Sequence, residues 1–315
     1  MLSLGIDHDG DHWKVAAWDE QTAADLRTLR VAGEVWEVVD EMLTLHPATP
    51  IVLPSGLGVP LTRAADLMDQ DIAEITLDND GRVASDLGSF LVEARRRALR
   101  AFCLPAVKLL PSVPLHRKIN RLDLGGAGAL CAAAWIIHSA GAQGCDVPAW
   151  GGILVHATRT GTCLLAIRAG QIIDGTGNLV PTPGRLPARK VEELLRRTAH
   201  LGSLRPRLHA PCPPEALVEA EGEILTQAVV GLLWFHGLLR VVVIGDRRAE
   251  IERLLGGRVP LAPAPPEGAG FEAALGAAVI AAGLTGGPTA GLVQHLGLRE
   301  ARERALDWLA PMPPR

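Results

Sequence analysis

The hydrophobic pattern of the first half of the chain predicts a β-hairpin followed by alternating helices and strands. Residues 2–6 and 13–18 are apolar runs that flank Asp9-Gly10, a dipeptide that strongly favours a hairpin turn. Beyond this hairpin we expect strands at 28–32, 51–53 and 107–110 and helices at 34–45, 86–100 and 123–140. The arginine-rich face of the helix at 86–100 is typical of a solvated surface. The helix at 123–140 is rich in glycine and alanine, which suits close packing against a second helix or a ligand.

The second half repeats this order of elements, although no repeat is visible in the residues themselves. Residues 153–156, 162–168 and 171–174 are short apolar runs separated by turn residues, which predicts an antiparallel meander. The further elements expected are a strand at 240–244 and helices at 188–200, 214–235, 248–255, 271–283 and 294–309. We therefore predict an α/β protein with two lobes, residues 1–146 and 147–315, joined by the helix at 123–140.

Composition narrows the classes of partner. With 315 residues, of which 48% are hydrophobic, the chain has enough apolar material for two cores. A net charge of −4, 3% aromatic residues and no tyrosine argue against nucleic-acid binding. The longest uncharged stretch, 273–298, is interrupted by Gly-Gly-Pro, so we expect helices buried in protein and no membrane partner. A small-molecule substrate is expected, and a homo-oligomer stays open.

The cysteines indicate a reducing compartment. Five of them are scattered along the chain without a C-x-x-C pair, and most stand in apolar surroundings. Such a pattern favours buried, inert thiols and a cytoplasmic location.

The two predicted hairpins are candidate phosphate-binding elements. Backbone N–H groups converge in such turns, and a nearby acid can hold Mg²⁺. Asp7 stands where such a metal-orienting acid would be at the first turn, although a plain polar turn is the alternative interpretation. Asp7, Asp9 and Asp11 match the first half of a calcium loop, but His12 and Trp18 stand where that loop needs glycine and glutamate. A dedicated metal site of the calcium or transition-metal kind is therefore not expected.

Two further stretches could form the walls of a ligand site. Ser55 and Gly56 belong to a glycine-proline loop directly after the strand at 51–53, and ligands of open α/β sheets bind beyond strand ends. Asp123 precedes Gly125-Gly126 and is either a helix cap or a catalytic base beside a close backbone approach. A basic cluster comes just before it, namely His116, Arg117, Lys118 and Arg121.

Several stretches together resemble one family. They are Gly5-Ile6-Asp7, residues 54–63, residues 113–125 with the specific run His116-Arg117-Lys118-Ile119-Asn120-Arg121, residues 153–155 and residues 170–175. The chain resembles, over nearly its whole length, the "predicted butyrate kinase" family of the acetate and sugar kinase, heat-shock chaperone and actin superfamily. This resemblance implies two ribonuclease-H-like lobes with Mg-ATP in the cleft and phosphate-binding turns at the head of each lobe.

The same resemblance implies roles for individual residues. Asp7 would hold Mg²⁺, the turns with Gly10 and with Thr158 and Gly161 would cradle phosphates, and Gly245 would approach the adenosine. Asp123 would orient the acceptor, while Arg117, Lys118 or Arg121 would neutralise developing charge. The residues expected at the substrate are Ser55, Gly56, His116, Arg121 and Asp174.

Two departures from the family pattern keep a second function open. Asp9 stands where the first turn of the family has glycine, and His156 and Thr158 stand where the second lobe has an acid and a glycine. An aspartate at a phosphate turn adds charge repulsion, and a missing acid weakens metal positioning. The leading hypothesis is ATP-dependent phosphoryl transfer to a small acceptor such as a carboxylate. The alternatives are a catalytically weak nucleotide-binding or scaffold protein and an obligate subunit of a larger complex.

Overall fold

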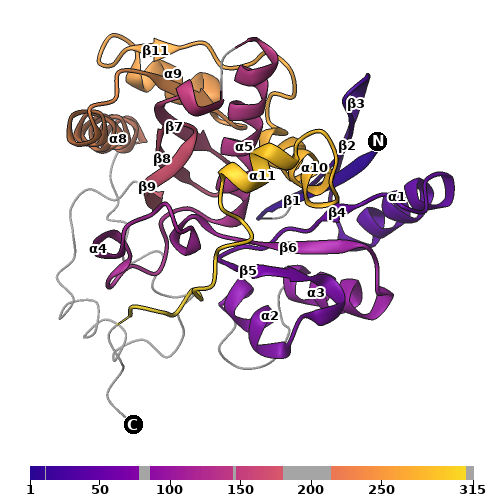
Figure 1. Cartoon of the computed structure of the whole chain (residues 1–315). Coiled ribbons are helices and arrows are strands. Elements are labelled where there is room, and N and C mark those ends of the chain that lie inside the picture. The colour runs from indigo at the N-terminus through magenta and orange to yellow at the C-terminus, as the bar shows by residue number, and fades with distance from the viewer. Residues whose placement is uncertain (11, 78–85, 145–146, 180–213, 310–315) are drawn as a thin grey trace.

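The computed structural model describes residues 1–10, 12–77, 86–144, 147–179 and 214–309, and it confirms an α/β fold with two lobes. Each lobe contains one sheet, and helices lie between the two sheets and on their outer sides (Figure 1). The predicted helix at 188–200 lies outside the described residues. Among these residues, no helix combines the length and apolar composition that crossing a bilayer requires.

The first sheet has six strands in the order β3-β2-β1-β4-β6-β5. Their bounds are β1 Ser3–Asp9, β2 His12–Asp19, β3 Thr22–Leu29, β4 Ile51–Val52, β5 Gly58–Arg63 and β6 Ala101–Pro105. β1, β2 and β3 are antiparallel, as the hairpin signal predicts, whereas β4 and β6 run parallel to β1. Asp9 pairs with His12, and Gly10 has a φ of 66° that glycine adopts readily.

The second sheet has five strands in the order β11-β10-β7-β8-β9. Their bounds are β7 Gly152–Ala157, β8 Thr162–Arg168, β9 Gln171–Leu179, β10 Val241–Ile244 and β11 Leu261–Ala262. β7, β8 and β9 form the expected antiparallel meander, and β10 adds in parallel to β7. Both sheets therefore begin with a hairpin whose first strand also pairs with a parallel strand.

A layer of small-residue helices fills the space between the two sheets. It consists of α5 (Ala127–Ala142) and α10 (Glu272–Leu284), with the short α11 (Ala290–His295) beside them (Figure 1). A Cβ atom on Gly276 of α10 would overlap the Cys131 carbonyl oxygen of α5, and one on Gly5 of β1 would overlap the Ala274 carbonyl oxygen. α10 thus packs on the first sheet although it comes late in the sequence, and the division at residue 146 stays a prediction.

Larger side chains cover the outer sides. The first sheet carries α1 (Ala32–Leu45), α2 (Asp69–Thr76) and α3 (Asp86–Arg97), and the second carries α8 (Pro214–His236) and α9 (Arg248–Leu255). Trp13 of β2, Trp36 of α1 and Phe90 of α3 form a buried aromatic cluster. Each lobe therefore has an outer core of its own in addition to the central layer that both share.

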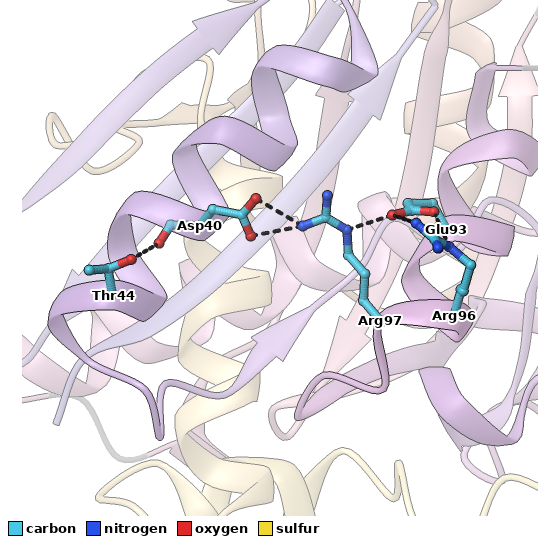
Figure 2. A network of polar contacts seen from close by, with 5 residues as sticks. All are labelled: Asp40, Thr44, Glu93, Arg96 and Arg97. Carbon is cyan, nitrogen blue, oxygen red and sulfur yellow. Dashed lines mark hydrogen bonds and ion pairs between the residues drawn. The ribbon is translucent and has the colours of Figure 1, made fainter.

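The arginine-rich face of α3 is a structural surface. Arg97 donates from Nη1 to both carboxylate oxygens of Asp40 on α1, at 2.8 and 3.0 Å, and from Nε to Glu93 (Figure 2). Its guanidinium lies 4.4 Å from the Trp36 ring centre. Arg96 is 77% exposed, so this face is solvated as expected and also joins α3 to α1.

Several predicted elements are wrong or shifted. The apolar residues 107–110 form a 3₁₀ turn (Val107–Leu109), and the strand lies earlier, because one continuous apolar run can supply either type of element. The predicted strand at 28–32 is β3 at 22–29, an edge strand whose outward Asp25 and Arg27 hide its pattern. The strand predicted at 171–174 is longer than expected, since β9 continues to Leu179.

The final predicted helix, 294–309, is also wrong. The helix in this region is α11, which ends at His295. Gly297 follows with a φ of 66°, which turns the backbone out of the helical path.

Candidate functional site

A pocket of about 340 Å³ lies between the lobes, at the ends of β1 and β7. It collects Asp7, Ser55, Gly56, Asp123, Thr158 and Gly161 from the residues that the sequence singles out. It is also lined by Asp9, His156 and Cys163, and by an apolar wall of Leu57, Ile75, Leu77 and Leu87. The remaining predicted residues do not line it, namely Gly10, His116, Arg117, Lys118, Arg121, Asp174 and Gly245.

Glycines at the start of α5 allow the pocket to form. The N–H of Ala127 donates to the Gly56 carbonyl oxygen at 2.8 Å, and a Cβ on Gly126 would lie 2.8 Å from that same oxygen. A Cβ on Gly128 would lie 2.9 Å from Asp7 Oδ1. The close backbone approach predicted from these glycines is therefore to the 54–57 loop and to Asp7.

Asp7 has an altered ionisation. Burial raises the pKa of its carboxyl group from 3.8 to about 6, an increase that the nearby Lys14 ammonium opposes and the Asp9 carboxylate adds to. A buried carboxylate has lost its hydration, so a cation bound beside it stabilises the charged form. Mg²⁺ is commonly held by one or two carboxylates together with substrate phosphates, so Asp7 and its surroundings fit that ion.

His156 is a neutral imidazole at neutral pH. It is 7% exposed, and burial lowers its pKa from 6.5 to about 4, with Lys14 acting in the same direction. Burial likewise raises the pKa of Cys163 above its ordinary range, so its thiol stays protonated. The described cysteines are thus inert, as expected, while Cys145 and Cys212 lie outside the described residues.

Asp123 does not cap α5, because Gly126 occupies the cap position. Its Oδ1 accepts a hydrogen bond from the Gly125 N–H at 2.6 Å, and its Oδ2 accepts one from the Asn178 N–H at 3.1 Å. The carboxylate therefore joins the segment before α5 to the end of β9, at the border of the pocket.

Asp9 connects the two hairpin turns. Its Oδ2 accepts a hydrogen bond from the Arg159 N–H at 2.9 Å, and its Oδ1 accepts one from the Thr160 hydroxyl. Among the described residues that line the pocket there is no lysine or arginine. The pocket is therefore rich in carboxylates, with Asp7, Asp9 and Asp123 on its walls.

Gly245 and Lys14 lie on a second connection between the lobes. The Lys14 ammonium binds Asp246 at 2.7 Å and the Gly270 carbonyl oxygen at 2.6 Å. Gly245 has a φ of 97°, and a Cβ there would overlap the Ala157 carbonyl oxygen. Sequence reasoning missed Lys14, although a lysine inside an apolar strand of a chain with only four lysines was a usable signal.

The basic cluster before Asp123 is engaged elsewhere, which corrects its expected position. Lys118 on α4 (Leu115–Lys118) is 3% exposed and donates to Glu303 at 2.6 Å and to the Leu110 carbonyl oxygen. Arg117 pairs with the buried Asp174, which also contacts His236 of α8 at 3.0 Å. His116 and Arg121 are exposed. Lys118 and Arg117 thus stabilise the contacts of α4, and none of the four residues lines the pocket.

Comparison with known proteins identifies the family. The model for the family described as "Protein of unknown function (DUF1464)" matches residues 5–192, and the chain belongs to this family. No curated protein matches the sequence. At the level of the fold, the chain is similar to acetate kinase from Entamoeba histolytica, with a TM-score of 0.54 and 9% identity over 81% of this chain and 84% of that one.

Other solved structures align less closely. One is an inorganic polyphosphate/ATP-glucomannokinase from Arthrobacter sp. strain KM, with a TM-score of 0.45 and 15% identity over 89% of this chain and 98% of that one. Another is the activator of the 2-hydroxyisocaproyl-CoA dehydratase from Clostridium difficile with bound ADPNP, with a TM-score of 0.43 and 10% identity over 94% and 97%. At such identities the likeness concerns the fold, which is the two-lobed fold of actin-like ATPases and kinases.

Proposed function

We propose that this protein binds Mg-ATP between its lobes and transfers the terminal phosphoryl group to a small acceptor in the pocket. The observation that carries the proposal is the meeting of the two hairpin turns beside Asp7, in a fold shared with acetate kinase. Backbone amides of such turns bind phosphate oxygens, and a buried carboxylate binds the accompanying cation.

In this proposal Asp7 holds Mg²⁺, which when bound neutralises charge on the phosphates. The amides next to Gly10 and within 158–161 contact the phosphate oxygens. Asp123 orients the acceptor from the border of the pocket. Arg117 and Lys118 have no part in it, since their charges are already paired with Asp174 and Glu303.

The walls of the pocket bear on the class of acceptor. Leu57, Ile75, Leu77 and Leu87 offer an apolar surface that suits a short alkyl chain. A carboxylate acceptor, such as the butyrate that the family resemblance implies, would face Asp7, Asp9 and Asp123 without a lysine or arginine among the described lining residues. Such an acceptor therefore depends on the bound cation to offset its charge, whereas a neutral hydroxyl does not.

Calorimetric titration with Mg-ATP, followed by an assay of ADP release, tests the proposal. The assay should cover short-chain carboxylates and short-chain alcohols of equal length. We expect binding that needs Mg²⁺ and is lost in Asp7→Asn, and ADP release that depends on one acceptor class. Glu20→Gln, which removes an exposed charge from the far end of the first hairpin, is the matched control. Absence of nucleotide binding would refute the proposal.

A catalytically weak nucleotide-binding protein is the second candidate. It is favoured by the two polar connections that already join the lobes, Asp9 with Arg159 and Lys14 with Asp246. Binding of Mg-ATP without ADP release for any acceptor would support this candidate.

A further inference from the structure

The turn between β7 and β8 is built as an anion site. The Thr158 N–H and hydroxyl are both directed to the Gly161 carbonyl oxygen, at 2.8 and 3.2 Å, so the turn is closed by its own residues. This leaves the Arg159 N–H and the Thr160 hydroxyl available to an outside acceptor. A main-chain amide and a hydroxyl that converge in one turn are suited to the oxygens of a carboxylate or a phosphate.

Asp9 of the other lobe supplies the anion that this site holds. Its two oxygens each accept one of the two donors, Oδ2 from the Arg159 N–H at 2.9 Å and Oδ1 from the Thr160 hydroxyl. The side chain is nearly enclosed, with 7% of the residue exposed. The contact spans 150 positions in the sequence, so it exists only because the two lobes meet here.

The fit around this contact is tight. A Cβ atom on Gly10, the residue after Asp9, would lie 2.9 Å from the Thr160 methyl group. A phosphate group cannot bind the same two donors while Asp9 accepts from both, because each donor is already engaged and because two anions at the same donors repel each other.

We infer that Asp9 occupies the phosphate position of the second turn and competes with the nucleotide for it, so that Asp9 determines how tightly this chain binds a nucleoside triphosphate. The identity of the ligand rests on the proposed function, whereas the contact itself does not. In the ligand-free protein Asp9 holds the turns together, and binding of a triphosphate requires the carboxylate to leave Arg159 and Thr160. The observed dissociation constant then equals the intrinsic dissociation constant divided by the fraction of molecules in which Asp9 has left.

Titration of Mg-ATP into the whole 315-residue chain and two variants tests this competition. Asp9→Asn keeps the size of the side chain and removes its charge, and Asp9→Gly removes the side chain. We expect the dissociation constant to fall by about tenfold or more in Asp9→Gly and by less in Asp9→Asn, which can still accept from the Arg159 N–H. Glu20→Gln removes one exposed charge from the opposite end of the hairpin and should bind as the wild type does.

Hydrogen exchange of the Arg159 amide, measured by NMR without nucleotide, tests the contact independently of any ligand. We expect faster exchange in Asp9→Gly than in the wild type, at unchanged exchange in the core of β7. An unchanged rate at Arg159 would overturn the inference. Equal affinity for Mg-ATP in all four proteins would also overturn it and leave the proposed function standing. Failure of all four to bind Mg-ATP would refute the proposed function and the competition together, even with faster exchange at Arg159.

Discussion

The Lys14 ammonium lies 2.7 Å from the Asp246 carboxylate, so a side chain of the first sheet is paired with the loop that follows β10 in the second. Both side chains are largely buried, with 8% and 20% exposed. The Lys14 charge also opposes the rise of the pKa of Asp7 and contributes to the low pKa of His156. One lysine therefore connects the lobes and also acts electrostatically on Asp7 and His156.

Replacement of this lysine should weaken the fold. Lys14→Met keeps the aliphatic length but leaves the Asp246 carboxylate without its cation, and we expect the free energy of unfolding in urea to fall by about 2 kcal/mol. A double-mutant cycle with Asp246→Asn isolates the pair from the loss of each side chain alone. A coupling energy of zero would show that the pair does not stabilise the protein.

Local chemistry made part of this arrangement predictable. Asp9-Gly10 between apolar runs predicts the first hairpin because turn conformation depends on neighbouring residues only. The glycines before residue 130 likewise predict a close backbone approach, although the sequence does not say to what. Lys14–Asp246 and Asp9–Arg159 join residues 232 and 150 positions apart, so they follow from the packing of the lobes and from no local pattern.

The basic cluster shows that closeness in sequence does not predict which residues a side chain contacts. Closeness in sequence to Asp123 made Arg117 and Lys118 attractive as pocket residues. In the structure Lys118 pairs with Glu303, 185 positions away, and Arg117 pairs with Asp174. A charged residue on a helix as short as α4 is oriented by distant partners, which the local sequence does not reveal.

Removal of the Asp7 charge should stabilise the metal-free protein. The pKa of Asp7 is about 6 when folded and 3.8 in its ordinary state, so the folded protein binds the extra proton between these values and loses stability as pH rises through them. Asp7→Asn should therefore be more stable than the wild type at pH 7 by about 2 kcal/mol, with the difference disappearing towards pH 4.

Urea unfolding in the presence of a chelator, at pH 7 and near pH 4, measures this difference. Glu20→Gln serves as the charge-matched control and should show no such pH dependence. Addition of Mg²⁺ at pH 7 should then stabilise the wild type and leave Asp7→Asn unchanged. Equal stabilisation of both proteins would count against Asp7 as the metal ligand.

The contribution of His156 to the free energy of unfolding should depend on pH with the opposite sign. Its pKa is about 4 when folded and 6.5 in its ordinary state, so the unfolded chain binds the extra proton between these values. The contribution of a neutral His156 is complete above about pH 6.5 and is lost as pH falls towards 4, by as much as about 3 kcal/mol. His156→Gln should remove this loss, so its stability relative to the wild type should improve on acidification.

Urea midpoints of both proteins between pH 4.5 and 7.5 test the sign. His46→Gln, at an exposed position in the first lobe, is the control and should run parallel to the wild type. A difference between His156→Gln and the wild type that stays constant over this range would contradict a buried neutral imidazole.

The contact between α5 and α10 should tolerate no added methyl group. A Cβ atom on Gly276 would overlap the Cys131 carbonyl oxygen, which is backbone and cannot turn aside. Gly276→Ala must therefore separate the two central helices, and we expect a loss of about 1–3 kcal/mol in the free energy of unfolding. The cost should outweigh the gain in helix propensity that alanine normally brings.

Gly33→Ala in α1, where nothing lies within 4 Å of the added atom, should be neutral or slightly stabilising. Because α10 packs on β1 and α5 borders the pocket, Gly276→Ala should also weaken Mg-ATP binding, whereas Gly33→Ala should not. Equal stability of the two variants would mean that the central helices are less closely packed than the structure has them.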